Sequence, residues 1–214
     1  GMTNYIVGSF MIPMTDEFGW SRAEFSASRS IGQIILAATG FIIGSYIDRF
    51  GGKRFMIAGG IVLALSLFSL SRISSLTQWL VINGLVLTAG AAMVGNLVVN
   101  VTLGKWFVEK RGRAVALAGM GISLAGITLP PSVTWLIDSF GWRTAWEVLA
   151  FSAAAITLPA ALLVRRRPED FGLHPDGKTD AEVLAGDAEA AAADFMKSMT
   201  RAQAMRTSSF YFLV

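Results

Sequence analysis

Gly44–Arg54 reads GSYIDRFGGKR and separates two long apolar runs of the chain. The 18 residues of Ser30–Ile47 and the 17 residues of Phe55–Ser71 carry no charge. Two apolar segments joined by a short basic turn are typical of a pair of membrane-spanning helices with the turn on the cytoplasmic side. The stretch therefore predicts a membrane protein that contains helical hairpins.

The composition excludes an ordinary soluble domain. Of the 214 residues, 53% are hydrophobic and 15% are charged, and 22 are glycine, which lets apolar helices approach one another closely in lipid. The chain has no cysteine, so disulfides and thiolate metal sites are excluded. The single histidine, His174, has no second imidazole with which to share a metal ion. We therefore expect no metal and no cofactor.

Apolar length predicts six spans, of which the first is partial. The complete ones are long enough to cross, or nearly cross, a hydrocarbon core of about 30 Å at about 1.5 Å per residue. The expected spans are 4–14 (partial), 23–47, 55–71, 78–103, 114–137 and 146–164, followed by a linker over 165–207 and the start of a seventh span at 208–214. We expect an all-α, multi-pass protein of the cell membrane, truncated in its first helix and at the start of its seventh.

Lysine and arginine are distributed unevenly over the connections. The connections after the second, fourth and sixth spans carry 14 of them, the opposite connections carry only Arg22, Arg72 and Arg143, and Arg29 lies within a span. This bias predicts that the even-numbered exits, and with them the linker 165–207, are cytoplasmic. The net charge of +3 is explained by this topology, so we expect a lipid bilayer and no nucleic acid as the partner.

The basic turn also carries a family resemblance. Its pattern of a small residue, Gly44, then Asp48-Arg49, an aromatic residue, glycine and a basic pair resembles the loop between helices 2 and 3 of major facilitator superfamily transporters. Four further motifs are similar to those of the monocarboxylate-transporter-like and oxalate–formate-antiporter-like branches: Phe18–Glu24, Trp106–Ala114, Phe140–Arg143 and Arg167–Gly177. The resemblance covers essentially the whole chain. It implies the first six-helix bundle of that fold, made of 3+3 inverted repeats, plus the linker to a missing C-terminal six-helix half.

The same resemblance implies a conformational latch in this loop, made by Asp48 and Arg49 together with Gly44 and Arg54. Asp48 ends a helix, and its carboxylate can accept hydrogen bonds from the positive N-terminus of a neighbouring helix. The alternative is that these charges only fix the topology.

Polar groups at membrane depth are costly and usually face a cavity, so they are the candidates for substrate binding. Arg29 lies 19 residues from Asp48, about 28 Å along a helix and thus close to the outer surface. It either recognises an anion, reaches to water or pairs with Glu24. Gln33, one turn deeper, either contacts substrate or belongs to a helix-packing stripe with Gly40.

Asn96 and Asn100 are the second pair of candidates. Asn96 lies about 12 Å from Gly104 along a helix, near the middle of the bilayer, and Asn100 lies one turn away on the same face. Two amides at this spacing can hydrogen-bond a carboxylate or a hydroxyl. The alternative is an interhelical hydrogen bond to Ser123 or Thr39.

Pro130 and Pro131 follow Gly126 in the fifth span. Because proline lacks an N–H, these residues must disrupt the hydrogen-bond ladder near the outer end of the helix. Packing explains the glycine, and an outer gate is the functional interpretation of the prolines.

The expected function is transport of a small organic anion, a mono- or dicarboxylate, by alternating access. No Asp or Glu lies away from the ends of the complete spans, so symport, antiport and uniport stay open. Many proton-coupled drug antiporters of this superfamily carry an arginine in the region that corresponds to Thr88–Asn100, and this chain has none there. A drug–proton antiporter is therefore disfavoured. The alternative is a non-transporting sensor or assembly subunit on the same fold. An enzyme would need catalytic pairs at membrane depth, which the spans lack.

Overall fold

The computed structural model describes residues 2–50, 52–164, 174–179, 182 and 184, with the backbone alone described at 2–4, 41–50, 97 and 175. The elements of this part are all helical: α1 (Met2–Phe18), α2 (Arg22–Phe50), α3 (Gly52–Leu70), α4 (Leu76–Trp79), the π-helix η1 (Leu80–Leu87), α5 (Thr88–Met93), α6 (Asn96–Trp106), α7 (Arg111–Leu163) and the single 3₁₀ turn η3 (Pro175–Gly177). The prediction of an all-α fold is confirmed.

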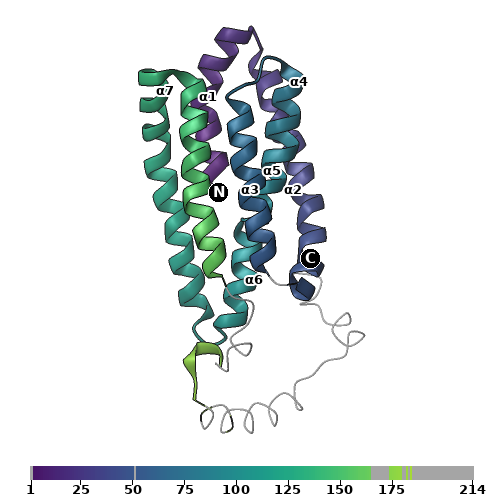
Figure 1. Cartoon of the computed structure of the whole chain (residues 1–214), viewed down its shortest axis with the longest axis vertical. Helices are drawn as coiled ribbons and strands as arrows, with labels where there is room; N and C mark the ends of the chain where they lie inside the picture. The colour runs from purple at the N-terminus through teal and green to yellow at the C-terminus, as the bar shows by residue number, and fades with distance from the viewer. Residues whose placement is uncertain (1, 51, 165–173, 180–181, 183, 185–214) are drawn as a thin grey trace, which may run out of the picture.

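The helices form an elongated bundle (Figure 1). α7 consists of two antiparallel arms that meet at Gly141, the one residue of α7 with non-helical torsion angles. α3 and α1 pack against α7, while α2 packs against η1 and α5. The end of α6 and both ends of α7 lie at the lower end of Figure 1, which we call the linker end. The connection 105–113 lies at this end, and the end of α2 and the start of α3 lie toward it as well.

Two tight turns at the opposite end share the sequence Phe-Gly-Trp. Gly19 joins α1 to α2 with a φ of +68°, and Gly141 joins the arms of α7 with a φ of +82°. A positive φ is costly for residues with a Cβ and readily adopted by glycine. The local sequence thus fixes where the chain reverses in both hairpins.

The same two turns contact each other. The rings of Phe18 and Trp142 lie edge to face with centroids 5.8 Å apart. The indole N–H of Trp142 donates to Glu17 Oε2 at 2.6 Å, and Arg143 pairs with Glu17 Oε1 at 2.7 Å. These contacts join α1 to α7 at the end opposite the linker.

The fourth predicted span, 78–103, is divided into several segments. It runs through α4, η1 and α5, and the helix breaks at Val94–Gly95 before α6 begins at Asn96. Gly95 is extended, and a Cβ added to it would lie 2.9 Å from the carbonyl oxygen of Ala91. The run Leu76–Trp106, which contains the range predicted as one span, is long and apolar enough to cross a membrane. Within it the backbone leaves the helix at Gly95, where only a residue without a side chain fits.

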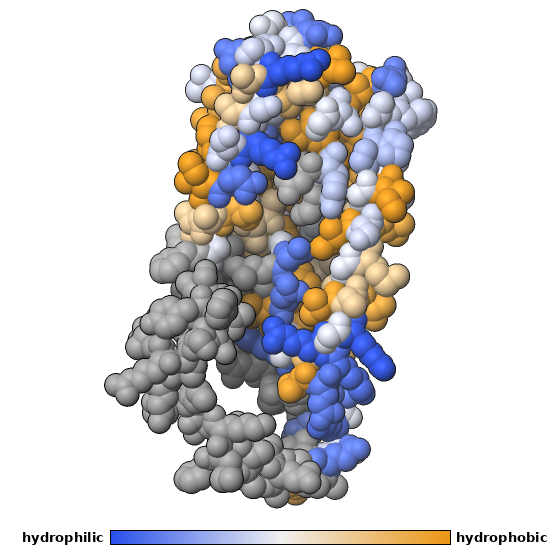
Figure 2. All heavy atoms as spheres, turned by 180° about the vertical axis from the view of Figure 1, so that it is seen from behind, coloured by the Kyte–Doolittle hydropathy of each residue, from blue (hydrophilic) through white to orange (hydrophobic). Residues whose placement is uncertain are grey.

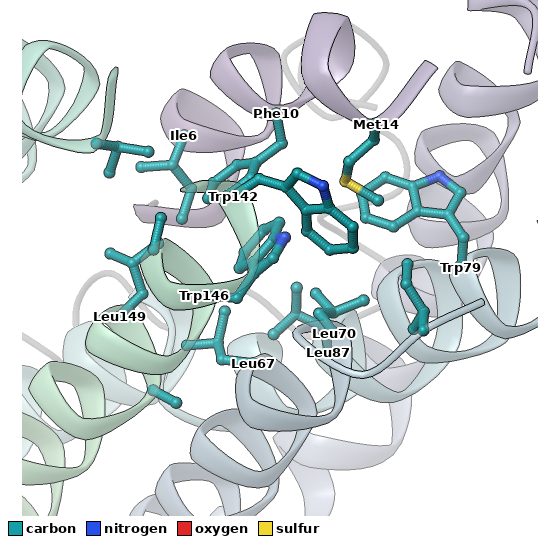
Figure 3. Packing of buried hydrophobic residues seen from close by; sticks show 14 of the residues in the cluster. Ile6, Phe10, Met14, Leu67, Leu70, Trp79, Leu87, Trp142, Trp146 and Leu149 are labelled. Carbon is teal, nitrogen blue, oxygen red and sulfur yellow. The ribbon is translucent and has the colours of Figure 1, made fainter. Parts of the chain in front are cut away.

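The core lies where α1, α3 and the second arm of α7 meet (Figure 3). The ring of Phe10 stacks on that of Trp146 with centroids 3.8 Å apart. Leu67 and Leu70 of α3 pack in the same cluster and are fully buried. This apolar cluster fixes α1 against the α7 hairpin and so positions one wall of the cavity described below.

Three described helices are long and apolar enough to cross a membrane: α3, the run Leu76–Trp106 and α7. The 53 residues of α7 cover the predicted span 114–137 and all but the last residue of the predicted span 146–164. Large apolar side chains such as Leu65, Ile127 and Phe151 are exposed on the outside of the bundle. An outward apolar surface is what a lipid environment requires, so the described bundle fits a multi-pass membrane protein.

Candidate functional site

A cavity of about 770 Å³ lies between α1, α2 and the segments of the fourth span. α1 contributes Tyr5 to its wall, α2 contributes Arg29 and Gln33, and α6 contributes its first residue, Asn96. The last three are exposed, so the cavity opens to the surface. Three of the four substrate-binding residues predicted from the sequence therefore contact one cavity.

Arg29 and Gln33 lie one helical turn apart on α2. The carboxylate of Glu24, a possible partner of Arg29, instead accepts hydrogen bonds from the backbone N–H and the hydroxyl of Ser21, both at 2.8 Å. Ser21 Oγ in turn accepts the backbone N–H of Glu24 at 3.2 Å, which makes this pair a capping box at the start of α2. Glu24 is thus engaged locally, and Arg29 stays a candidate for binding an anion.

The small residues of α2 differ in what they contact. A Cβ on Gly32 would lie 2.9 Å from Thr88 Oγ1, so Gly32 is needed for close packing against α5. A Cβ on Gly40 would meet none of the described atoms within 4 Å, although Gly40 also lines the cavity. Packing against the described residues therefore explains Gly32 and does not explain Gly40, which with Gln33 belongs to the cavity wall.

Asn83 and Thr88 are polar cavity residues that the sequence analysis did not select. The buried amide of Asn83 donates to Ser28 Oγ at 2.9 Å, and Ser28 donates to the carbonyl oxygen of Phe25 at 2.9 Å. Thr88 Oγ1 donates to the carbonyl oxygen of Asn83 at 3.1 Å, a five-residue spacing that matches the wider turn of a π-helix. An amide inside an apolar run, beside Gly84, is the signal that would have identified Asn83.

α6 begins inside the fourth span, with its N-terminus at the cavity. Its N-cap residue, Gly95, provides no side-chain hydrogen bond, and both Gly95 and Asn96 line the cavity. The first N–H groups of a helix lack intrahelical partners and carry partial positive charge. Arg29 adds a full positive charge, and none of the described residues that line the cavity is acidic. The cavity therefore favours a negatively charged ligand.

The structure separates the two amides that the sequence analysis placed together. Asn96 reaches the cavity, whereas Asn100, one turn further along α6, is half-buried and does not line it. The hydroxyl of Thr39, one alternative partner for Asn96, donates to the carbonyl oxygen of Ile35 at 2.6 Å. Asn96 is thus the member of the pair with access to a ligand.

The predicted latch falls mostly outside the described side chains. Gly44, Asp48 and Arg49 lie in the part of α2 for which the backbone alone is described. Arg54 is exposed in the first turn of α3. The latch therefore stays a prediction.

The predicted gate lies in the first arm of α7, which stays helical through Pro130 and Pro131. Gly126, four residues earlier, packs against α1, since a Cβ on it would lie 3.3 Å from Cζ of Tyr5. Tyr5 lines the cavity. Gly126 thus has a packing role beside the cavity, and a gate at the two prolines stays a prediction.

Figure 2 shows one face of the bundle, on which hydrophilic side chains are interspersed with apolar ones along the described part of the face. Polar groups away from the ends of a membrane helix bundle usually serve a binding site or a path. In the described part of the chain, no three His, Asp or Glu side chains lie close enough to hold a metal ion. The chemistry of the described cavity is therefore that of a guanidinium, amides and hydroxyls.

Comparison with known proteins gives a consistent result. The family model of the Major Facilitator Superfamily matches residues 1–213. The chain is 26% identical over 161 residues to the uncharacterized MFS-type transporter YcxA of Bacillus subtilis, covering 74% of this chain and 39% of that protein. It is 27% identical to the fujikurins efflux protein of Gibberella fujikuroi, over 69% of this chain and 32% of that protein. It is 33% identical to monocarboxylate transporter 6 of Homo sapiens, over 64% of this chain and 27% of that protein. The chain thus spans less than half the length of these relatives.

Proposed function

This chain belongs to the Major Facilitator Superfamily, and from that premise we propose that the full-length protein transports a small organic anion, a mono- or dicarboxylate, across a membrane. The observation that carries the proposal is the cavity in which Arg29 and the N-terminus of α6 occur together without an acidic neighbour among its described lining residues. One of the relatives is named a monocarboxylate transporter, which supports the same substrate class.

The cavity offers three kinds of group to a carboxylate. Arg29 can donate two parallel hydrogen bonds to the two carboxylate oxygens, a geometry that lysine cannot reproduce. The N-terminus of α6 adds backbone N–H groups and partial positive charge, as in transporters whose interrupted helices point an N-terminus at an anionic substrate. The amides of Gln33 and Asn96 can donate to or accept from the hydroxyl or keto oxygen of a small organic acid.

Transport requires a second bundle in addition to this one. In the superfamily fold, two six-helix bundles rock against each other around a site near the middle of the membrane. In this proposal the cavity of the described bundle is one wall of such a site, and a C-terminal half outside this chain provides the other. The 214-residue chain alone is therefore expected to bind substrate weakly and to give no saturable flux.

The test is uptake of radiolabelled lactate, pyruvate, oxalate and succinate into proteoliposomes that contain the full-length protein. We expect saturable uptake of at least one of these acids. Arg29→Gln should raise its KM by about tenfold or more, because a hydrogen bond to a charged group is lost. Arg29→Lys should recover only part of the loss, because an ammonium group cannot make the bidentate contact.

Arg22→Gln is the matched control, because Arg22 is also exposed and lies on the same helix but does not line the cavity. It should leave the KM unchanged. Uptake of neutral or cationic solutes that does not depend on Arg29 would overturn the anion assignment. Absence of flux for every solute, together with a stably copurifying membrane partner, would favour the sensor or assembly role instead.

A further inference from the structure

The loop between α6 and α7 holds a carboxylate from the linker. Asp176 Oδ2 accepts hydrogen bonds from the backbone N–H groups of Val108 at 2.9 Å and Glu109 at 2.8 Å. Its second oxygen, Oδ1, accepts the N–H of Lys110 at 3.2 Å. Three successive backbone N–H groups therefore converge on one side chain that lies more than sixty residues away in the sequence.

The local sequence explains why this loop binds an anion. α6 ends at Trp106, Phe107 is extended, and α7 begins at Arg111 after an N-cap at Lys110 that makes no side-chain cap hydrogen bond. The N–H groups of Val108–Lys110 thus lie between two helices, and all three donate to Asp176. Successive N–H groups of this kind form a nest for an anion, and the adjacent N-terminus of α7 adds partial positive charge.

The backbone conformation of the linker at Asp176 and Gly177 places the carboxylate at this loop. Asp176 has a φ of +60°, and among the described residues it is the one non-glycine residue with a positive φ. Gly177 follows with a φ of +71°, and its N–H donates to the carbonyl oxygen of His174 at 3.2 Å. A left-handed backbone is costly for most residues with a side chain and is tolerated best by Asn and Asp. The Pro-Asp-Gly turn therefore accepts a strained conformation that places the side chain of Asp176 in the nest.

Neighbouring contacts strengthen the same docking. Lys178 pairs through Nζ with Glu109 Oε1, so the residue that provides the central N–H of the nest also binds the linker through its side chain. Directly after Lys178, Thr179 donates its backbone N–H and its hydroxyl to Glu182, both at 2.8 Å. The N–H of Glu109, followed by those of Lys110 and Val108, holds the pKa of Asp176 below its ordinary value.

We propose that Val108–Lys110 is a docking site for the linker and that the Asp176 carboxylate is its ligand. The contact, which we call the Asp176 clasp, fixes the turn 174–178 to the loop between the fourth and fifth predicted spans. The free part of the linker then begins after Lys178 and not after Val164. Because the reach of a linker scales with roughly the square root of its free length, the clasp shortens the tether that limits movement between the two halves.

The experiment uses the full-length protein in detergent and compares Asp176→Asn with Asp138→Asn by hydrogen–deuterium exchange. Asparagine tolerates the left-handed backbone of residue 176, so the turn is retained while the charge of the ligand is removed. We expect exchange in peptides that cover 107–112 to accelerate several-fold in Asp176→Asn. Asp138 is an exposed residue of α7 three positions before Gly141, where the two arms of α7 meet, and its substitution should leave these peptides unchanged.

A second measurement uses the absence of cysteine from this chain. Any cysteines in the rest of the full-length protein are first replaced by serine, and Glu109→Cys and Lys178→Cys are combined. A short bifunctional thiol reagent should then join the two positions in native membranes. Adding Asp176→Asn should reduce the cross-linked fraction several-fold, and adding Asp138→Asn should not. Equal exchange and equal cross-linking with and without the Asp176 carboxylate would overturn the clasp.

Discussion

Trp142 donates its indole N–H to the carboxylate of Glu17 over 2.6 Å, and this hydrogen bond joins the α1–α2 turn to the turn between the two arms of α7. Arg143 pairs with the other oxygen of the same carboxylate at 2.7 Å. Trp142 first, and Arg143 second, hold the pKa of Glu17 below its ordinary value. Glu17 lies beyond the apolar stretch 4–14, where water reaches it, so its charge can respond to the pH of the medium.

The thermal stability of the full-length protein should therefore decrease on acidification through the titration of Glu17. A carboxyl group with a lowered pKa in the folded state stabilises that state above its ordinary pKa, and the contribution is lost as the pH falls through the lowered value. We expect Glu17→Gln to lower the Tm at neutral pH by a few degrees. It should also reduce the fall in Tm that occurs when the pH drops below 4.5, the ordinary pKa of a glutamate carboxyl group. Thermal unfolding in detergent at a series of pH values measures both effects.

Asp16→Asn provides the matched control for that series, because it removes a carboxylate one residue earlier on the same exposed turn of α1. Its profile should follow that of the unmodified protein. If the two variants showed the same loss, the hydrogen bond from Trp142 and the ion pair with Arg143 would not be the cause.

The helices were predictable because the lengths of the apolar runs and the residues of the turns between them indicate the same boundaries along most of the chain. The Phe-Gly-Trp sequences at 18–20 and 140–142 interrupt long apolar runs, and both glycines adopt the positive φ that reverses the chain. The resemblance to transporters predicted the family that the family model confirms over 1–213. The substrate candidates Arg29, Gln33 and Asn96 were found because polar groups are rare in apolar helices.

The parts that escaped prediction depend on tertiary contacts. Nothing in the apolar run 78–103 indicates that its first half is π-helical, and in the structure this half packs against α2 and α3. The break at Gly95 is the exception, because it is local: a Cβ there would lie 2.9 Å from the carbonyl oxygen of Ala91. Asn83 reaches the cavity only because the π-helical turn and Gly84 bring it to Ser28 of α2. The equal spacing of Asn96 and Asn100 suggested a pair, but only Asn96, the first residue of α6, lines the cavity.

Trp146 offers a test of the core. Its ring is fully buried and stacks on Phe10, while its Nε1 finds no acceptor among the described residues. Trp146→Ala should destabilise the full-length protein by about 3–5 kcal/mol, because it removes a large buried side chain and leaves a cavity. Trp146→Phe should cost much less, because it keeps most of the stacked ring and removes an N–H whose burial without a partner costs about 1–3 kcal/mol. Denaturation in detergent compares the two, and an equal loss for both would show that the indole N–H has a partner that matters.

Asn96 and Asn100 offer a test of the cavity with identical chemistry at both positions. Asn96→Ala removes an amide that lines the cavity and should raise the KM of the transported acid several-fold. Asn100→Ala removes an amide one turn away that does not line it and should leave the KM close to that of the unmodified protein. Initial rates of uptake into proteoliposomes, normalised to the amount of inserted protein, measure the difference. A larger effect at Asn100 would mean that the substrate binds nearer to the linker end of the bundle than the cavity lies.

Gly59 and Gly119 test whether close helix approach holds the bundle together. A Cβ on Gly59 of α3 would lie 2.5 Å from Met93 Cβ and 3.1 Å from the carbonyl oxygen of Gly90. Atoms cannot approach so closely, so Gly59→Ala must push α3 away from α5, at a cost of about 1–3 kcal/mol for overpacking. A Cβ on Gly119 of α7 would meet none of the described atoms within 4 Å, and alanine favours a helix by up to about 1 kcal/mol over glycine. Gly119→Ala should therefore leave the Tm of the full-length protein unchanged or slightly raised, whereas Gly59→Ala lowers it. The opposite order would mean that α3 and α5 are further apart in the membrane than in this structure. It would also mean that a part of the full-length protein outside this chain covers the surface at Gly119.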